Sequence, residues 1–303
     1  MCGIAGILTK NPVTPEQLEQ VRRMNDRLVH RGPDGGGEYH DQHIALAMRR
    51  LSIIDLKTGW QPLFNEDKTL VLITNGEIYN YVELRRELQA RGHRFNTGSD
   101  CETILHLYEE HGRSCVHHLR GMFAFALWDT QRKHLLLARD RMGEKPLYLY
   151  EKDHCLYFAS EMKALLQCGQ IPFELDAVSI QEYFHFLFVP EPATPIKGVR
   201  KLPAAHTLYI HSPTWQIDEK RYWRMEDAPP IEGNAFSIIR QELESISEIV
   251  VRSDVPVGVA LSGGIDSSAV TALAARKYPG TCLLYTSDAA DDLLCVDLGG
   301  RRI

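Results

Sequence analysis

The pattern of hydrophobic and polar positions predicts alternating helices and strands in the first quarter of the chain. Residues 14–30 predict a helix, because a Thr-x-x-Gln capping box precedes apolar residues at helical spacing. The glycine-rich segment 30–40 predicts a loop. Residues 43–55 and 70–80 are rich in aliphatic and β-branched residues and predict strands.

The middle of the chain is dominated by paired apolar runs. Residues 121–140 and 146–160 each place two such runs around a short polar turn, which is typical of antiparallel hairpins. Further elements are predicted as helices at 81–92, 99–112, 161–169 and 176–188 and as strands at 206–212 and 220–223. Helices outside paired strands indicate an α+β domain over residues 1–223, with antiparallel sheets covered by helices on their outer faces.

The pattern changes after residue 223. Residues 224–234 contain two prolines, acidic residues and a glycine, and predict a linker. An amphipathic helix is predicted from residue 235. A buried strand, a glycine turn and a helix over residues 257–280 predict a βα unit of a parallel sheet, so residues 235–280 indicate a second architecture.

Composition excludes several classes of protein. The 303 residues are 44% hydrophobic and 24% charged with a net charge of −6, which gives no basic field for nucleic acid. Seven cysteines without CxxC spacing argue against a disulfide framework and favour a reducing compartment. We find no signal peptide and no apolar run that would span a bilayer, and we expect a cytoplasmic protein without membrane or nucleic-acid partners.

The opening residues, MCGIAGIL, place a cysteine directly after the initiator methionine. A buried cysteine behaves as a small hydrophobe, so Cys2 could simply belong to a first strand. Removal of Met1 would instead leave a thiol and a free α-amine on one residue. Their ordinary pKa values, about 8.5 and about 7.7–8.0, are well matched for proton exchange. This arrangement would make Cys2 a nucleophile that carries its own base.

Residues 262–268 read SGGIDSS at a predicted junction between strand and helix. Gly263 and Gly264 permit a tight turn, and the following helix N-terminus presents N–H groups to an anion. The lysine of a P-loop is absent. The alternative is a glycine turn with a serine cap, but the pattern favours phosphate binding, with Asp266 available to a magnesium ion.

These motifs together resemble one enzyme family. MCGIAGI resembles the start of class II glutamine amidotransferases, and SGGIDSS resembles the pyrophosphate loop of ATP pyrophosphatases. In this order they resemble the glutamine-hydrolysing asparagine synthetases over residues 1 to about 280. Other motifs that carry the resemblance are HRGPD, RLSIID, NGEIYNY, TGSDCETIL, GMFAFALWD, ARDRMGEKPLY and SEMKALL. The segment KLPAAH departs from the family's Pro-Gly before the histidine, which should affect only a turn.

The resemblance implies a fold and a reaction. The fold is an α+β N-terminal-nucleophile domain, an αββα sandwich, followed by an incomplete α/β domain of the ATP-pyrophosphatase type. The implied reaction makes asparagine from aspartate, ATP and glutamine, and releases AMP, pyrophosphate and glutamate. ATP would act with Mg²⁺, whereas glutamine hydrolysis would need no cofactor. A homodimer is one expected assembly.

The resemblance also assigns roles to individual residues. Asn75 and Gly76 would form the oxyanion hole beside Cys2, although Asn-Gly alone favours a turn. Arg50 would bind the α-carboxylate of glutamine, and Asp100 its α-ammonium; the alternative for Asp100 is a helix N-cap, and the two roles are compatible. The remaining glutamine-site residues would be Leu51, Ser52, Ile53, Ile54 and Glu77. The expected ATP-binding residues are Leu261, Ser262, Gly263, Gly264, Asp266 and Ser267.

Residues 281–303 match nothing in the family and are expected to be foreign, so the chain should retain only glutamine hydrolysis. The alternative is that these residues form a divergent strand and turn.

Two rival functions remain open. They are an ATP-dependent amidotransferase for another carboxylate and a non-catalytic glutamine- or nucleotide-binding module.

Residues 106–118 gather four histidines and a cysteine without HExxH or CxxC spacing, so no metal cluster made by the protein alone is expected there.

Overall fold

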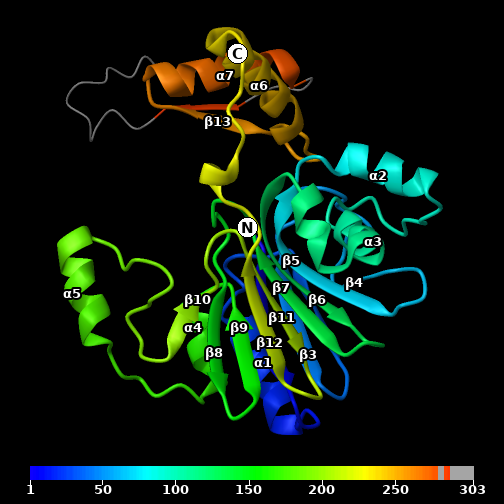
Figure 1. Ribbon diagram of the computed structural model, residues 1–303, viewed down its shortest axis with the longest axis vertical. Coiled ribbons are helices and arrows are strands. Elements are labelled where there is room, and N and C mark those ends of the chain that lie inside the picture. The colour runs from blue at the N-terminus through cyan, green and yellow to red at the C-terminus, as the bar shows by residue number, and fades with distance from the viewer. Residues whose placement is uncertain (279–282, 287–303) are drawn as a thin grey trace. The chain divides into compact units, whose positions relative to one another are not determined.

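The computed structural model describes residues 1–278 and 283–286 and divides into two compact units, Met1–Ala228 and the chain from Pro229 onward (Figure 1). Each unit is described by itself. The first contains two six-stranded sheets in which every strand pair is antiparallel. The sheets therefore assemble from hairpins and longer returns, as the paired apolar runs predict.

The strand order of the two sheets is as follows. The first sheet runs β10 (Val199–Lys201), β8 (Tyr148–Lys152), β9 (Cys155–Ala159), β1 (Gly3–Thr9), β3 (Ile44–Arg50) and β2 (Gly35–His40). The second runs β12 (Gln216–Arg221), β11 (His206–His211), β7 (His134–Arg139), β6 (Gly121–Asp129), β5 (Leu70–Ile78) and β4 (Leu63–Phe64).

Helices cover the outer face of each sheet (Figure 1). They are α1 (Pro15–Asp26) and α4 (Met162–Leu165) on one sheet and α2 (Tyr81–Ala90) and α3 (Glu102–His111) on the other. Helix α5 (Ala177–Phe186) stands apart from both sheets and buries only Ser179, and the 3₁₀ turns are η1 (Gly112–His118), η2 (Leu166–Cys168) and η3 (Met225–Asp227). Helices α2 and α3 share one apolar cluster with β5, β6 and β7, while α1 and α4 share another with β1, β3 and β9. A third cluster joins the inner faces of both sheets. The expected αββα sandwich is confirmed.

Local sequence signals explain several element boundaries. Helix α1 begins after Thr14, whose side chain accepts from the Gln17 amide while the Gln17 side chain accepts from the Thr14 amide, so the predicted capping box is present. Both predicted hairpins form, as β6–β7 and β8–β9. Strand β12 begins earlier than predicted and ends at Arg221, and β4 and β10 are too short for the pattern to have indicated them.

The prediction of a loop over residues 30–40 is wrong in its second half. Residues 35–40 form β2, an edge strand paired with β3. Its glycines are required by close approach, because a Cβ on Gly37 would lie 2.0 Å from the Gln61 carbonyl oxygen. Composition alone suggested flexibility, whereas pairing with the next strand, β3, makes this segment a strand.

The departure at KLPAAH falls, as expected, in a turn. Ala205 lies between β10 and β11 with a φ of +58°, the left-handed region that glycine adopts at no steric cost. Its amide donates to the Asp140 carbonyl and its carbonyl accepts from Tyr222, so the turn is held by the same hydrogen bonds any residue could make.

The second unit contains α6 (Ala235–Val250), β13 (Gly258–Leu261), α7 (Ile265–Lys277) and β14 (Leu283–Thr286). Strands β13 and β14 pair in parallel, so the strand, turn and helix of the predicted βα unit are present. The prediction that the strand is buried is wrong, because the residues of β13 alternate between exposed and half-buried. Helix α6 buries no residue, and α7 buries only Thr271 and Ala274. Most of the segment expected to be foreign, 281–303, lies outside the described residues, and that expectation stays a prediction.

Two of the exclusions drawn from composition have a structural counterpart. Among the described helices, none is both long and apolar enough to cross a membrane. The five cysteines within the described ranges are all free. The absence of a disulfide framework, which the scattered spacing predicted, therefore holds for this part of the chain.

We expect Leu137→Ala to lower the free energy of unfolding of the first unit by about 2–5 kcal/mol, because this fully buried side chain lies in the cluster between the sheets. Urea titration followed by tryptophan fluorescence checks it, since all four tryptophans belong to residues 1–228. Leu56→Ala, at a leucine 43% exposed, is the matched control and should change the midpoint little. Equal destabilisation by both variants would contradict the assigned core.

Candidate functional site

One cavity in the first unit collects residues from four distant segments. It is lined by Cys2 just before β1, by Arg50 at the end of β3, by Asn75 within β5 and by Asp100 just before α3. The other lining residues are Met1, Leu51, Ile53, Ile54, Gly59, Gln61, Gly76, Glu77, Ser99, Cys101, Met122 and Lys145. Of the residues predicted for glutamine binding and cleavage, only Ser52 does not line it; its amide donates to Asp34 Oδ2 at 2.7 Å.

The Cys2 thiol is held against the first residue after β3. The Leu51 amide donates to Cys2 Sγ at 3.4 Å, and Sγ lies 3.6 Å from the Leu51 carbonyl oxygen. The Arg31 guanidinium donates to the Cys2 carbonyl at 2.8 Å, which fixes the backbone. Burial raises the pKa of the Cys2 thiol, although the Leu51 amide and the nearby Arg50 act in the opposite direction.

Met1 lines the same cavity and is itself partly exposed to solvent. The α-amine belongs to Met1, and burial lowers its pKa. The Lys145 ammonium lies 3.2 Å from the Met1 sulfur. With Met1 in place the Cys2 nitrogen is part of a peptide bond, so only removal of Met1 creates a basic amine next to the thiol.

Asn75 and Gly76 lie inside strand β5, so the alternative of an Asn-Gly turn is wrong. Both side-chain polar atoms of Asn75 are buried without a hydrogen-bond partner, which is rare in folded proteins and leaves this amide available to a ligand. Gly76 must be glycine, because a Cβ there would lie 2.2 Å from the Met122 carbonyl oxygen on the paired strand β6.

Arg50 is buried and partly satisfied by the backbone of the segment that follows β3. Its Nη2 donates to the carbonyls of Ile54 at 3.1 Å and Asp55 at 2.6 Å, and its guanidinium lies 5.1 Å from the Trp60 ring centroid. Its Nη1 is buried without a partner. One edge of the guanidinium is therefore fixed while a donor remains for an anionic group.

Asp100 does not cap α3, so that alternative is wrong. The N-cap of α3 is Cys101, and Asp100 Oδ2 instead accepts from the Ile78 amide at 2.7 Å. Burial raises the pKa of the Asp100 carboxyl group. Burial, followed by repulsion from Asp100, also raises the pKa of Glu77. A cation from a ligand would relieve both effects, because it would favour the charged carboxylates.

Lys145 is a lining residue that the sequence analysis did not single out. Asp140, which is 1% exposed, accepts from the amides of Phe123, Met142, Glu144 and Lys145 at 2.9–3.2 Å. This one carboxylate folds the loop that brings Lys145 to the cavity. The motif ARDRMGEKPLY was recognised, but nothing in its spacing indicated which of its charged residues would reach the site.

The expected ATP loop lies between β13 and α7 in the second unit. Gly263 has a φ of +82°, and a Cβ there would meet no atom within 4 Å, so the backbone is open to an approaching ligand. Ser262 and Ser267 pair through their hydroxyls at 3.0 Å, and Asp266 lies in the first turn of α7. These residues suit an anion at a helix N-terminus.

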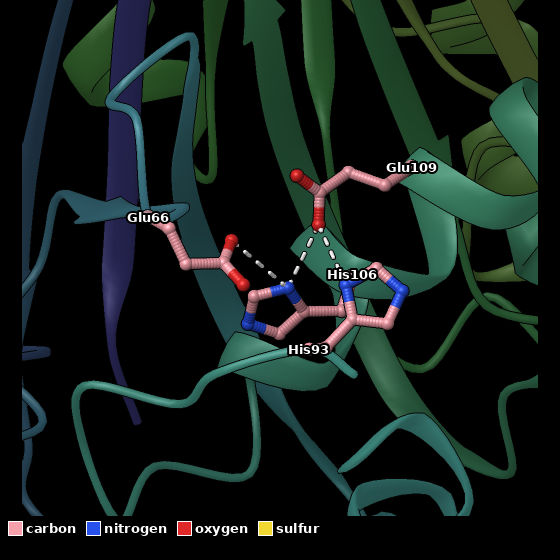
Figure 2. Close-up of side chains that lie close together, drawn as sticks. All are labelled: Glu66, His93, His106 and Glu109. Carbon is pink, nitrogen blue, oxygen red and sulfur yellow. Dashed lines mark hydrogen bonds and ion pairs between the residues drawn. The ribbon is translucent and has the colours of Figure 1, made fainter. Parts of the chain in front are cut away.

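No metal cluster was expected from residues 106–118, yet the structure assembles a candidate group there. His106 and Glu109 lie beside Glu66 and His93 (Figure 2). The spacing within residues 106–118 did not predict this group, because Glu66 and His93 come from other segments. None of the four residues lines the cavity that holds Cys2.

Comparisons with known proteins identify the families that this chain matches. Residues 1–223 match the glutamine amidotransferase domain family, and residues 239–292 match the asparagine synthase family. The second match reaches into the segment 281–303.

The relatives include asparagine synthetase 1 (glutamine-hydrolysing) of Bacillus subtilis, 43% identical over 92% of this chain and 44% of its own length. Asparagine synthetase B of Escherichia coli is 38% identical over 92% of this chain and 45% of its own length. The chain thus spans about half the length of the curated relatives it matches.

Solved structures support the fold. Glutamine phosphoribosylpyrophosphate amidotransferase of B. subtilis superposes with a TM-score of 0.53 at 20% identity, covering 91% of this chain and 64% of that one. A second structure, described as the allosteric regulatory enzyme of purine biosynthesis, gives a TM-score of 0.56 at 20% identity, with 90% and 63% covered. The chain belongs to the glutamine amidotransferase family through residues 1–223, and the match that follows gives it the domain order of the glutamine-hydrolysing asparagine synthetases.

Proposed function

We propose that residues 1–223 hydrolyse glutamine to glutamate and ammonia, with Cys2 as the nucleophile. The observation that carries this proposal is the cavity itself, in which the Cys2 thiol shares a wall with an unpartnered Asn75 amide and an unpartnered Arg50 donor. Orphaned buried donors cost folding free energy, and a substrate that supplies acceptors recovers it.

The reaction proceeds in two halves once Met1 has been removed. The Cys2 thiol attacks the side-chain amide carbon of glutamine, and the Cys2 α-amine accepts the thiol proton. The Asn75 side chain and the Gly76 amide donate to the resulting oxyanion. Return of the proton to nitrogen expels ammonia and leaves a thioester. Water, deprotonated by the same α-amine, then cleaves the thioester and releases glutamate.

Recognition of glutamine rests on its two charged backbone groups. The free Arg50 donor binds the α-carboxylate, while the buried Asp100 carboxylate accepts from the α-ammonium. Glu77 and the segment Leu51–Ile54 line the remainder of the pocket, with Ser52 behind it.

For the whole protein we propose glutamine-dependent formation of asparagine. The relatives are named as asparagine synthetases, and the Ser262–Ser267 loop suits a phosphate group. Magnesium-bound ATP would supply a leaving group for the aspartate carboxylate, giving an aspartyl-adenylate and pyrophosphate, and ammonia would displace AMP. Asp266 and the hydroxyls beside it are the residues that would hold the magnesium and the phosphates.

Several finer expectations belong to the same proposal. The alternative acceptor is another carboxylate. We also predict that this chain is restricted to glutamine hydrolysis, that it is cytoplasmic and that it forms a homodimer. The domain boundaries 1–223, 224–234 and 235–280 stay predictions as well. A non-catalytic binding module is the rival class, and the shared cavity of Cys2 and Asn75 argues against it.

Purified chain given glutamine, aspartate and Mg-ATP should release glutamate without asparagine. Asn75→Ala should lower kcat for glutamate release by about 100- to 1,000-fold, since it removes an oxyanion donor. Cys2→Ala should abolish release, and Asn11→Ala, at an exposed asparagine, should not change it. Coupled assays of glutamate and asparagine check all four results. Wild-type glutamate release by Cys2→Ala would exclude Cys2 as the nucleophile, whereas no glutamate release by the processed wild-type chain would favour the binding-module alternative.

Arg50→Lys should raise KM for glutamine by about 10-fold or more, because lysine keeps the charge but cannot hold the Ile54 and Asp55 carbonyls while binding a carboxylate. Arg49→Lys is the matched control. Arg49 pairs with Asp26 outside the cavity, so its KM should stay near the wild-type value. A comparable rise in KM for both variants would remove Arg50 from the proposed site.

In chain that retains Met1, the alkylation rate of Cys2 should rise about tenfold per pH unit. The rate should not level off at any pH below the ordinary pKa of a cysteine thiol, about 8.5. Burial raises the pKa of this thiol, so the reactive thiolate is scarce at neutral pH. Iodoacetamide labelling read by peptide mass spectrometry measures it. Processed chain, with its α-amine on Cys2, is the comparison and should react faster at pH 7. A plateau near pH 7 with Met1 present would contradict the assigned environment.

A further inference from the structure

Four side chains that could bind a metal ion converge outside the glutamine cavity (Figure 2). Glu66 follows strand β4, and His93 lies in the loop after α2. His106 and Glu109 lie three residues apart on α3 and so share one face of that helix. We name these four residues the His/Glu cluster.

The inward atoms of the cluster lie close to the spacing of metal ligands. Glu109 Oε2 lies 2.8 Å from His106 Nδ1 and 3.2 Å from His93 Nδ1, and Glu66 Oε2 lies 3.7 Å from His106 Nδ1. All four inward atoms lie within 4.8 Å of one another. A tetrahedral zinc ion with bonds of about 2.0–2.1 Å needs ligand atoms about 3.3 Å apart. Small shifts would therefore close the site around an ion.

Both histidines turn their second nitrogen toward a carboxylate. His93 Nε2 lies 2.9 Å from Glu110 Oε1. His106 Nε2 is buried without a hydrogen bond and lies 3.9 Å from Glu102 Oε1. A carboxylate behind a metal-binding histidine orients the ring and increases its basicity, and it is a usual companion of zinc sites.

The two carboxylates of the cluster are held from behind in the same way. Glu109 Oε1 accepts from the Asn65 side chain at 2.8 Å, and Glu66 Oε1 accepts from the Arg94 amide at 2.8 Å. Each carboxylate thus keeps one oxygen fixed by the protein and directs the other into the cluster. Such hydrogen bonds from behind orient carboxylates in metal sites.

Burial of the cluster decreases from one side to the other. His106 is fully buried, and Phe95 packs on its ring with a centroid separation of 4.4 Å. The His93, Glu109 and Glu66 side chains are 14%, 26% and 34% exposed. An ion could therefore enter from the Glu66 side while His106 holds the base of the site rigid.

We propose that the His/Glu cluster binds one zinc ion through Nδ1 of His93 and His106 and one oxygen each of Glu66 and Glu109. Two imidazole nitrogens with two carboxylates suit zinc better than magnesium or calcium, which prefer oxygen ligands alone. The ion cross-links the β4–β5 connection and the α2–α3 loop to α3. Its role is structural, since the cluster does not reach the glutamine cavity.

Without a metal the same groups form an ion-paired cluster, which is the competing explanation of the geometry. Burial alone would lower the pKa of His106, but the carboxylates of Glu102 and Glu109 outweigh it and raise this pKa to about 9. Around neutral pH the His106 ring is then protonated, and an arriving zinc ion must displace that proton. The two explanations differ in what they predict for added metal.

The test uses the full chain, stripped with a chelator and titrated with Zn²⁺ and with Co²⁺. We expect one Zn²⁺ per chain by elemental analysis, the strong visible absorption of four-coordinate Co²⁺, and a higher Tm with metal. Glu66→Gln and His93→Gln should each weaken zinc binding by at least about 10- to 100-fold. Both positions are partly exposed, so these variants should fold, unlike changes at His106.

Two controls separate this site from other metal ligands. His118→Gln removes an exposed histidine outside the cluster and should leave the affinity unchanged. Cys2→Ala should also retain the metal, which excludes the thiol as a ligand. Binding below one ion per chain, or equal affinity in the cluster variants and the wild type, would overturn the proposal and leave an ion-paired cluster. Loss of glutaminase activity would not bear on it, because the cluster is separate from that cavity.

Discussion

Burial of β1 is the constraint on which the glutamine site depends. Every residue from Gly3 to Thr9 is buried, with β3 and β9 on its edges, the second sheet on one face and α1 on the other. Full burial of Ile4, Ile7 and Leu8 contributes about 1.5–3 kcal/mol each. Cys2 directly precedes this strand, so the proposed nucleophile takes its position from the core and has little freedom of its own. An N-terminus, ordinarily a mobile part of a chain, becomes one of the most firmly placed.

The site is built from polar groups that the fold leaves unsatisfied. Both polar atoms of the Asn75 side chain and one guanidinium nitrogen of Arg50 are buried without partners. Each such group costs stability, and the two packed sheets around the site supply the apolar burial that offsets it. The donors need no rearrangement when substrate arrives, which is the condition for effective stabilisation of a developing charge. The close contact at Gly76 also shapes the site, because strands β5 and β6 approach here to a distance that a side chain would prevent.

The sequence predicted what is encoded locally. The capping box of α1, the hairpins and the change of architecture after residue 223 depend on nearest neighbours and on periodicity, so they could be recognised. The candidate glutamine residues came from motifs, and all but Ser52 line one cavity. Strand β2 was missed because its glycines signal flexibility, whereas its structure comes from pairing with β3. The His/Glu cluster was missed because distant segments bring its residues together, and Lys145 was missed because the spacing of its motif does not show which charged residue reaches the cavity.

Helix α3 takes part in both the cavity that holds Cys2 and the His/Glu cluster. Asp100 lies just before its first turn, and the Asp100 carbonyl accepts from the Thr103 amide and hydroxyl, so the helix start and the glutamine cavity share one anchor. Two turns further on, the same helix carries His106 and Glu109. Each added residue turns an α-helix by about 100°. A single insertion between Thr103 and His106 would therefore rotate His106 and Glu109 away from the cluster, or Asp100 away from the cavity. We expect changes in the length of this short segment to be tolerated far less than substitutions of its side chains.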